Sequence, residues 1–394
     1  MRRDLPAAAL LGTLVLASPR LGAQRPSLTA YYQNVGIGIG AADAAPAGAL
    51  DDQRLRVMWT PRVATVAIDV AYEQTIIWRD SPATTAEGGL LPGARSGGDW
   101  LDVGGPVYDG AHVSWRQRFD RLSASYTSGP VTATVGRQAV SWATTLFLTP
   151  ADPFVPFDPS DPFREYRTGI DAARVQWFAG PFSTLDLVVR PADSPIGRTI
   201  TALLRGKTTL NGWDLSMWGG AIHDAPGGAL GLTTTLGGSA IRAEAAFRRD
   251  TIGHAIARTA LGVDHRFSVL DRDLYTVVEY QHDAFGAEHA SDLAAVAQSA
   301  AAWRNELQVF GRDEAAVQAT YQVHPLVSAE VLTLLNLRDG SMLFSPTAAV
   351  SLGNDATVRA GVFVASGKGG DRTAPRSEYG RVPRSAYVAL SMFF

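Results

Sequence analysis

Residues that could act on a solute or an ion gather in one proline-rich segment, residues 143–167. Its charged side chains are carboxylates and guanidinium groups of mixed sign, namely Asp152, Asp158, Asp161, Arg164, Glu165 and Arg167. Fixed charges of this kind set the electric field wherever a passage narrows. A second interpretation is a calcium site, because Asp158, Ser160 and Asp161 offer oxygen ligands, although their spacing follows no EF-hand pattern.

The same segment has the composition of a stiff loop. Its repeated prolines fix φ and push the preceding residues towards extended geometry, so little entropy is lost on ordering. We expect aromatic side chains to anchor it, namely Phe147, Phe154, Phe157 and Phe163. Folded inward, the segment would place its charges at a constriction; folded outward, it would be a compact surface loop pinned by its own aromatic residues.

Other chemistries find little support in the sequence. The chain has no cysteine, which excludes a thiol nucleophile, a thiolate metal site and a lipoprotein anchor. The formal net charge of -3 gives no basic field for nucleic acid. The dinucleotide-binding, Walker and zinc patterns are missing. We therefore expect no nucleic-acid partner, no cofactor and no metal ion.

Catalysis is also not expected. The seven histidines are scattered along the chain, and no nucleophile motif adjoins any of them. Four of them fall near the ends of strands that we assign to one rim of the molecule: His223, His254, His282 and His289. A hydrolase site at that rim is therefore the least favoured alternative.

The elements that position these residues are strands, because the dominant hydrophobic period after residue 27 is two. Residues 241–248 show the pattern clearly: one face carries isoleucine, alanine and phenylalanine, and the other carries arginine and glutamate. Residues 315–323 and 356–364 repeat it. We predict strands over residues 28–39, 52–60, 63–79, 113–128, 131–142, 168–178, 182–190, 199–208, 212–223, 228–237, 240–249, 256–267, 273–284, 312–323, 326–337, 342–352, 355–366 and 382–394.

The connections between these strands are sorted by length. Every second connection is short: Pro61-Arg62, Gly129-Pro130, Gly180-Pro181, Asn211-Gly212, Gly237-Gly238, Leu270 to Asp273, His324-Pro325 and Asn354-Asp355. The intervening ones include all the long ones: 80–112, 143–167, 285–311 and 367–381. A soluble sandwich has no reason to sort its loops this way, whereas a transmembrane barrel has short periplasmic turns and long external loops.

Both ends of the chain carry export signals. Arg2 and Arg3 precede an apolar run over residues 7–17, so we assign residues 1–23 to a secretory signal peptide. Residues 24–394 then form one domain, because no stretch has the composition of an interdomain linker. The chain ends in an alternating strand that resembles the signal read by the bacterial barrel-assembly machinery, with Tyr387, Leu390, Met392 and Phe394 as its candidate residues.

The physics of the bilayer fixes the fold class. In hydrocarbon every backbone N–H and C=O must be paired, so strands can span only as a closed barrel without a free edge. We therefore predict an all-β fold, a closed antiparallel transmembrane β-barrel of about 18 strands, an even number as such barrels require. Alternation assigns the following charged residues to the inner face: Arg242, Glu244, Arg248, Arg258, Asp264, Arg266, Glu279 and Arg359.

One stretch resembles a known family. A strand that contains Gly136-Arg137-Gln138 and ends at Trp142 is followed by an Asp-Pro-Phe-rich loop and then by Gly169-Ile170-Asp171-Ala172-Ala173-Arg174. This order, over residues 136–177, resembles a group of largely uncharacterised porin-like bacterial outer-membrane proteins. The resemblance implies an outer-membrane β-barrel and no particular substrate. In general porins the third external loop narrows the barrel, and residues 143–167 are the third external loop here.

Together these patterns predict a bacterial outer-membrane channel for passive diffusion of small polar solutes or ions, with residues 143–167 as a constriction. Mixed signs on the inner face favour no strong preference for anions or cations. The alternative is a structural or adhesive barrel without an open pore. Residues 291–303 have helical spacing and predict a short helix in an external loop. Expected partners are outer-membrane lipid, the assembly machinery and small solutes, and a homotrimer is the assembly that general porins suggest.

Overall fold

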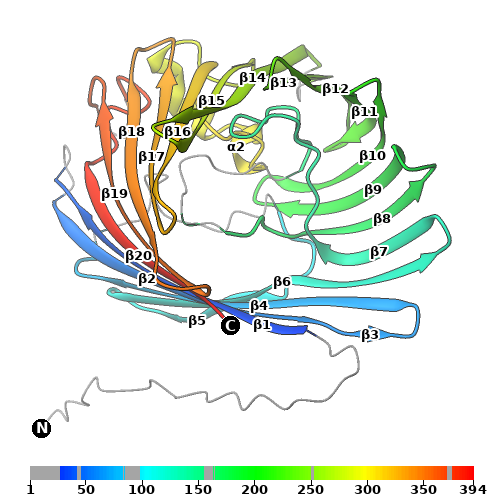
Figure 1. Cartoon of the computed structure of the whole chain (residues 1–394), viewed down its shortest axis with the longest axis horizontal. Coiled ribbons are helices and arrows are strands. Elements are labelled where there is room, and N and C mark those ends of the chain that lie inside the picture. Colours follow the sequence, from blue (N-terminus) through cyan, green and yellow to red (C-terminus); the bar gives the residue numbers. More distant parts are fainter. Residues whose placement is uncertain are drawn as a thin grey trace, which may run out of the picture.

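Strands close into a barrel around a central lumen in the computed structural model (Figure 1). It describes residues 27–41, 46–82, 84, 98–154, 163, 165–249, 253–370 and 375–394. The first ten strands are β1 (Ser27–Ile39), β2 (Gly48–Thr60), β3 (Arg62–Val63), β4 (Val66–Arg79), β5 (Gly104–Asp109), β6 (Val113–Ser128), β7 (Val131–Gln138), β8 (Ile170–Phe178), β9 (Ser183–Ser194) and β10 (Gly197–Leu210). The others are β11 (Trp213–Ile222), β12 (Ala225–Leu236), β13 (Ser239–Arg249), β14 (Ala255–Val269), β15 (Arg272–Asp283), β16 (Asp313–His324), β17 (Val327–Asn336), β18 (Met342–Ser351), β19 (Ala356–Ser366) and β20 (Ser385–Phe393).

The barrel has eighteen wall strands in the part of the chain that the structure describes, as the sequence predicts. Each wall strand pairs antiparallel with the next one along the chain, and β3 and β5 are short additional strands. The wall closes where β1 pairs with β20, in a register that sets Tyr31 opposite Phe393. Beyond this pair, Ala30 and Phe394 exchange two backbone hydrogen bonds of 2.8 and 3.0 Å. The barrel therefore has no unpaired seam at its ends.

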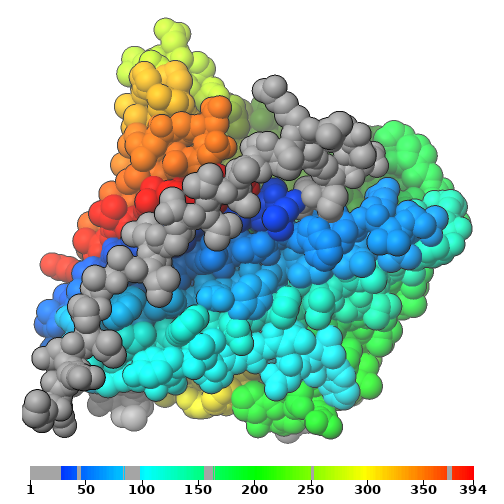
Figure 2. Space-filling model, turned by 90° about the horizontal axis from the view of Figure 1, so that it is seen from below, coloured from blue at the N-terminus to red at the C-terminus, as the bar shows by residue number. Residues whose placement is uncertain are grey.

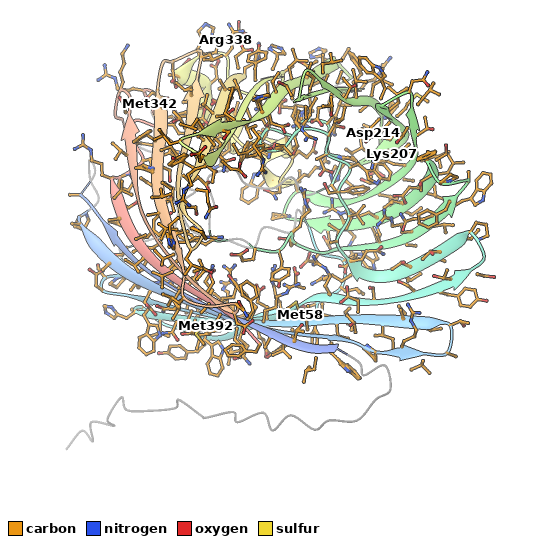
Figure 3. The ribbon with its side chains drawn as sticks, viewed as in Figure 1. Met58, Lys207, Asp214, Arg338, Met342 and Met392 are labelled. Carbon is orange, nitrogen blue, oxygen red and sulfur yellow. The ribbon has the colours of Figure 1, made fainter. Side chains whose placement is uncertain are left out.

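The two faces of the wall differ as the alternation predicts. On β13, Phe247 is 56% exposed on the outer face, whereas Glu244 is 4% exposed on the inner face. Side chains extend both outward and into the lumen around the ring (Figure 3). Figure 2 shows the outer surface of one side, where the strands from β1 to β7 form oblique neighbouring bands. An apolar outer surface over a fully paired backbone is the arrangement that lipid requires.

Most predicted turns are confirmed, and one is displaced. The turn expected at Pro61-Arg62 lies at residues 64–65, because pairing continues past the proline into β3. Ile68 donates its backbone N–H to the carbonyl of Pro61 at 2.9 Å. Proline has no N–H to return this bond, so its pair with Ile68 keeps one of the two ladder hydrogen bonds, at the end of the strand.

Two other boundaries also differ from the prediction. The strand expected over residues 131–142 ends at Gln138, because Val140 and Trp142 turn inward and join an apolar cluster with Phe154. The connection expected over residues 80–112 contains an unexpected strand, β5, which pairs with β6 beyond the point where β7 stops. Its sequence, with two glycines and a proline in six residues, has no alternating pattern that would predict a strand.

The helical prediction over residues 291–303 is confirmed as three short pieces. They are η1 (Ala290–Asp292), α1 (Leu293–Ala297) and α2 (Ala300–Trp303). The Ser299 hydroxyl caps α2 by accepting a hydrogen bond from the N–H of Ala302 at 3.3 Å. Among the described residues, none of the helices has the length and apolar composition needed to cross a membrane.

Candidate functional site

The third external connection covers residues 139–169, and its described residues, 139–154, 163 and 165–169, turn into the barrel (Figure 1). The indole N–H of Trp142 donates to Asp186 on β9 at 3.1 Å. From β11, the indole of Trp218 donates to the carbonyl of Ala151 at 3.2 Å. These residues share an apolar cluster with Phe154, so the described part of the loop is packed against the inner wall. We call residues 139–169 the lumen loop.

Two wall carboxylates hold the backbone of the lumen loop. Glu244 on β13 accepts N–H bonds from residues 144, 145 and 151, at 2.9, 3.3 and 2.9 Å. Glu279 on β15 accepts N–H bonds from residues 146, 147 and 148, at 2.6, 2.8 and 2.9 Å. Loop amides that would otherwise be unsatisfied inside the barrel thereby gain charge-assisted acceptors. Both glutamates are among the predicted inner-face residues, and both bind the loop.

Asp152 organises the lumen loop from within. Its carboxylate accepts hydrogen bonds from the Ser141 hydroxyl at 2.7 Å and from the backbone N–H of Phe154 at 3.2 Å. Arg167 forms an ion pair with it at 3.1 Å and so joins the two ends of the loop. The predicted charges at positions 152 and 167 are therefore used largely to shape the loop. The predicted charges Asp158, Asp161 and Arg164, together with the calcium ligands proposed around Ser160, lie outside the described residues.

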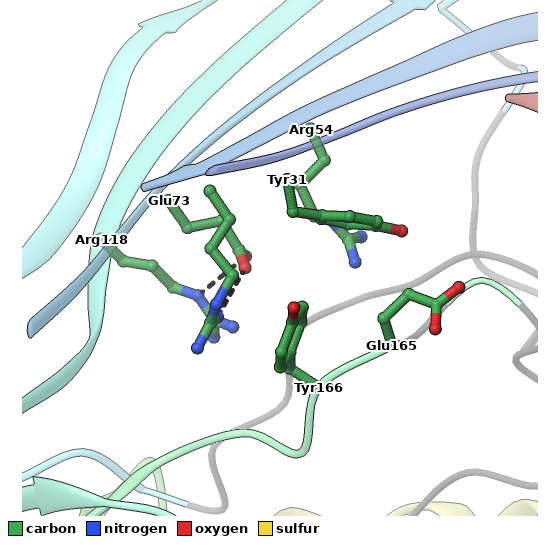
Figure 4. A pocket seen from close by; sticks show the side chains of 7 residues that line it. Tyr31, Arg54, Glu73, Arg118, Glu165 and Tyr166 are labelled. Carbon is green, nitrogen blue, oxygen red and sulfur yellow. Dashed lines mark hydrogen bonds and ion pairs between the residues drawn. The ribbon is translucent and has the colours of Figure 1, made fainter. Parts of the chain in front are cut away.

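On the opposite side, the loop faces the wall near the barrel seam. Glu165 forms an ion pair of 3.1 Å with Arg359 on β19. Tyr166 lies under the guanidinium group of Arg56, 4.6 Å from its ring centre, and edge-on to Tyr31 at 5.8 Å. Figure 4 shows the small cavity between loop and wall, which is lined by Tyr31, Arg54, Arg56, Glu73, Arg118, Glu165 and Tyr166. Three guanidinium groups, two carboxylates and two aromatic rings thus meet beside the loop.

The wall side of this cavity is an ion-pair network that the sequence analysis missed. Arg56 on β2 contacts Glu73 on β4 at 3.2 Å and Asp120 on β6 at 2.7 Å. Arg118 contacts the same two carboxylates, at 3.2 and 3.1 Å. The available signal was the alternation of charges at positions 52, 54 and 56 within the predicted strand 52–60. That alternation marks an inner face, but it does not say which three strands meet there.

The remaining predicted inner-face residues form ion pairs with neighbours. Arg242 pairs with Asp264 at 2.9 Å, both on the inner wall. Arg266, in contrast, lies near the periplasmic end of β14, where its side chain is 64% exposed and pairs with Asp273 at 2.9 Å. The structure therefore places Arg266 at the rim of the barrel.

A second external connection also enters the lumen. Residues 284–312 join β15 to β16, and Gln308 donates to the carbonyl of Phe147 in the lumen loop at 2.6 Å. Glu306 in the same connection forms an ion pair with Arg248 on β13. Arg258 on β14 holds Asp283 through two hydrogen bonds of 3.0 and 2.7 Å. The predicted residues Arg248 and Arg258 therefore anchor this second connection.

His223 lies in the tight external turn between β11 and β12, beside this group of arginines. Its ring is buried, and its Nδ1 lies 2.8 Å from the hydroxyl of Thr199. Burial above all, and then the neighbouring arginines, lowers the pKa of His223 to about 2. The ring is therefore neutral near pH 7. On the other side of the ring, Nε2 lies 3.7 Å from Oε1 of Glu306.

Metal-binding geometry is missing from the described part of the chain. No three histidine or carboxylate side chains in it are placed to hold one ion. At the C-terminus, Tyr387 faces the lumen and packs edge-on against Phe163 of the lumen loop, with their ring centres 4.7 Å apart. Of the predicted assembly-signal residues, Tyr387 thus lies on the face opposite to Leu390, Met392 and Phe394.

Solved structures with the same fold come from outer-membrane porins. OccD3 (OpdP) of Pseudomonas aeruginosa is 11% identical, with 94% of this chain and 91% of that chain covered and a TM-score of 0.54. OpdK of the same organism, solved with vanillate, is 10% identical, with coverage of 93% and 98% and a TM-score of 0.53. A BenF-like porin from Pseudomonas fluorescens Pf-5 is 9% identical, with coverage of 94% and 98% and a TM-score of 0.54.

No protein-family model matches the chain, and no curated protein matches it in sequence. The evidence for its class is therefore the fold, the closed wall and the apolar outer face. The predicted resemblance is confirmed at the level of the fold: the chain is a closed antiparallel β-barrel with the fold of outer-membrane porins.

Proposed function

We propose that this barrel is a channel for passive diffusion of small polar solutes or ions, narrowed by the lumen loop. One observation carries the proposal: a loop held by polar contacts lies inside a wide wall whose inner face is charged. Barrels of 16 to 18 strands are wide enough to enclose a water-filled passage beside such a loop. The homotrimer expected from general porins stays a prediction.

The pair Glu165 and Arg359 is the proposed charge gate of this passage. It joins the lumen loop to β19, and both side chains keep partial access to solvent. Because fixed charges beside a narrow passage act on each passing ion, removing either one changes the balance between anions and cations. We expect Arg359→Gln to shift the reversal potential towards cation preference and Glu165→Gln to shift it towards anion preference.

The experiment is single-channel recording of the purified, refolded protein in planar bilayers under a salt gradient. Stepwise conductance supports the channel, and opposite shifts in the two variants support the gate. Arg266→Gln is the matched control, since it removes the same charge at the periplasmic rim. Bilayers without stepwise conductance would contradict the channel. Equal reversal potentials in the wild type and all three variants would contradict the gate.

We further propose small organic anions as solutes. The cavity beside Tyr166, about 10 Å³, has room for a water molecule only, so this proposal rests on the chemistry of its lining: guanidinium groups beside aromatic rings attract a carboxylate on an aromatic or apolar body. Vanillate, present in the OpdK structure, is a molecule of this kind. Benzoate and vanillate should block the salt current at lower concentrations than uncharged benzyl alcohol, and Arg54→Gln should weaken that block several-fold.

A structural or adhesive barrel without an open pore is the alternative. It is favoured by the second connection in the lumen, because residues 284–312 also fill space there. The same bilayer recordings decide between the two functions.

A further inference from the structure

Two buried glutamates face each other at the external mouth of the barrel. Glu314, at the start of β16, is completely buried, and Glu378 lies in the connection between β19 and β20 with 8% exposure. Their carboxyl groups meet beside Gly311. Gly311 covers them so closely that an added Cβ would lie 2.1 Å from Oε1 of Glu314 and 2.8 Å from Oε2 of Glu378. Two carboxylates rarely share a dry site unless something neutralises one of them.

The hydrogen-bond donors around the pair show where the proton must lie. Both oxygens of Glu378 accept: Oε1 from the backbone N–H of Phe310 at 2.6 Å, and Oε2 from the side-chain amide of Asn336 at 2.7 Å. The amide cannot be flipped, because its oxygen already accepts the backbone N–H groups of residues 338 and 339, at 2.9 and 3.1 Å. Glu378 is therefore placed to be the ionised partner.

Glu314 has the complementary arrangement. Its Oε2 accepts from the Tyr379 hydroxyl at 3.1 Å, while no donor in the described structure reaches its buried Oε1. A proton on Glu314, donated to Glu378, satisfies that oxygen and removes the repulsion.

Among the described residues, the other charged groups near the pair do not supply a neutralising cation. Asp339 adds a further negative charge, because its carboxylate accepts the backbone N–H of Glu378 at 2.7 Å. Arg338 pairs with Asp313, which also accepts from His282 at 2.8 Å, and Arg312 pairs with Glu288 at 2.6 Å. In the described part of the chain, Tyr379 is the remaining titratable neighbour. A proton is thus the simplest neutraliser of the pair.

We propose that Glu314 and Glu378 share one proton and act as a latch that holds three external connections together at the barrel mouth. Through Phe310, Asp339 and Glu378 the latch joins residues 284–312, 337–341 and 367–384. Tyr379 extends this assembly into an apolar cluster with Leu148 and Phe163 of the lumen loop. Loss of the shared proton leaves two charges in contact, and their repulsion separates the connections.

The test is a distance measurement between spin labels, which does not depend on conduction. The chain has no cysteine, so Ala295→Cys and Arg376→Cys place single labels on two of the connections at exposed positions. We expect a narrow distance distribution at low pH that shifts and broadens as pH rises over about 4 to 10, a range that brackets ordinary carboxyl and phenol pKa values. Glu314→Gln keeps a donor towards Glu378 and should keep the narrow distribution throughout.

Glu330→Gln is the matched control, because this glutamate accepts from Gln318 on the inner wall, away from the mouth, and should leave the response intact. Heat-dependent mobility in gels checks that each labelled barrel is folded. The latch is overturned if the wild-type distances do not change with pH, or if Glu314→Gln still responds. It is also overturned if the distances follow added Ca²⁺ and chelator, since a cation and not a proton would then bridge the pair. If the protein shows no conductance in bilayers but its spin-label distances depend on pH, the proposed function is refuted and the latch is supported.

Discussion

Arg137 on β7 holds both carboxylate oxygens of Asp171 on β8, at 2.8 and 2.7 Å, and the pair fixes residues 98–109, between β4 and β6, in the barrel wall. Asp171 also accepts the backbone N–H groups of Trp100 and Leu101, both at 2.8 Å. Arg137 donates to the carbonyl of Leu101 at 2.7 Å. Because β7 and β8 are short, residues 98–109 continue the wall above them, and this ion pair is their attachment. The motif that carries the family resemblance thus has a structural role.

Arg137→Ala should therefore loosen the wall segment 98–109. Removing one partner of a buried ion pair leaves an uncompensated charge on Asp171 and costs about 3 to 5 kcal/mol. Chymotrypsin should cleave the variant near Trp100 and Tyr108 much faster than the wild type. The double variant Arg137→Met with Asp171→Asn removes both charges, keeps an acceptor for the N–H groups of Trp100 and Leu101, and should recover part of the stability against urea. Equal cleavage of wild type and Arg137→Ala would contradict the role of the pair.

Much of the wall was predictable from the sequence because lipid imposes a strict alternation. On β13, each outward side chain must be apolar and each inward one is free to be polar, so Phe247 and Glu244 could be assigned to opposite faces. For the lumen loop the sequence favoured an inward position and left an outward one open. A proline-rich segment with several phenylalanines offers a stiff backbone and apolar anchors, and Phe154 and Phe163 do pack inside the barrel.

The contacts between elements were not predictable from one sequence. Nothing local indicates that Arg56, Glu73 and Asp120 meet, since they lie on three strands whose register is set by the whole wall. The strand β5 was missed because its two glycines and its proline have low strand propensity. Its pairing with β6 stabilises it instead. The displaced turn after Pro61 has the same origin: tertiary pairing decides where the hairpin closes.

Glu279→Gln should release the lumen loop without disturbing the wall. The carboxylate accepts three backbone N–H groups on its two oxygens. An amide must point its NH₂ group at one or two of those donors, so at least one loop N–H loses its acceptor, at a cost of about 1 to 3 kcal/mol. We expect larger and noisier single-channel currents. Glu330→Gln, on the inner wall but away from the loop, should keep the wild-type current, and an unchanged current in Glu279→Gln would argue against a loop-defined constriction.

His223 should make the barrel less stable in acid. Its folded-state pKa of about 2 lies below the ordinary value, so the unfolded chain binds the proton more readily. The stability that neutral His223 contributes is complete above about pH 6.5 and is lost as pH falls towards 2, by about 1.4 kcal/mol per unit. Urea unfolding at pH 7 and pH 5, for wild type and His223→Gln, measures the difference. Parallel losses in the two proteins would contradict this assignment.

Alanine variants of Phe394 and Tyr387 should distinguish an effect on assembly in the cell from an effect on the stability of the folded barrel. Phe394 is 59% exposed on the outer face, and its contacts with Ala30 are backbone hydrogen bonds that an alanine side chain preserves. Phe394→Ala should therefore refold into detergent micelles as well as the wild type, but reach the outer membrane in reduced amounts if the machinery reads this residue. Tyr387 is buried between Phe163 and Phe363, so Tyr387→Ala should lose about 3 to 5 kcal/mol of stability in vitro. The measurements are the heat-shifted band in outer-membrane fractions and the midpoint of urea unfolding. Normal cellular levels of Phe394→Ala would show that the terminal aromatic side chain is not required for assembly, whatever the result for Tyr387→Ala.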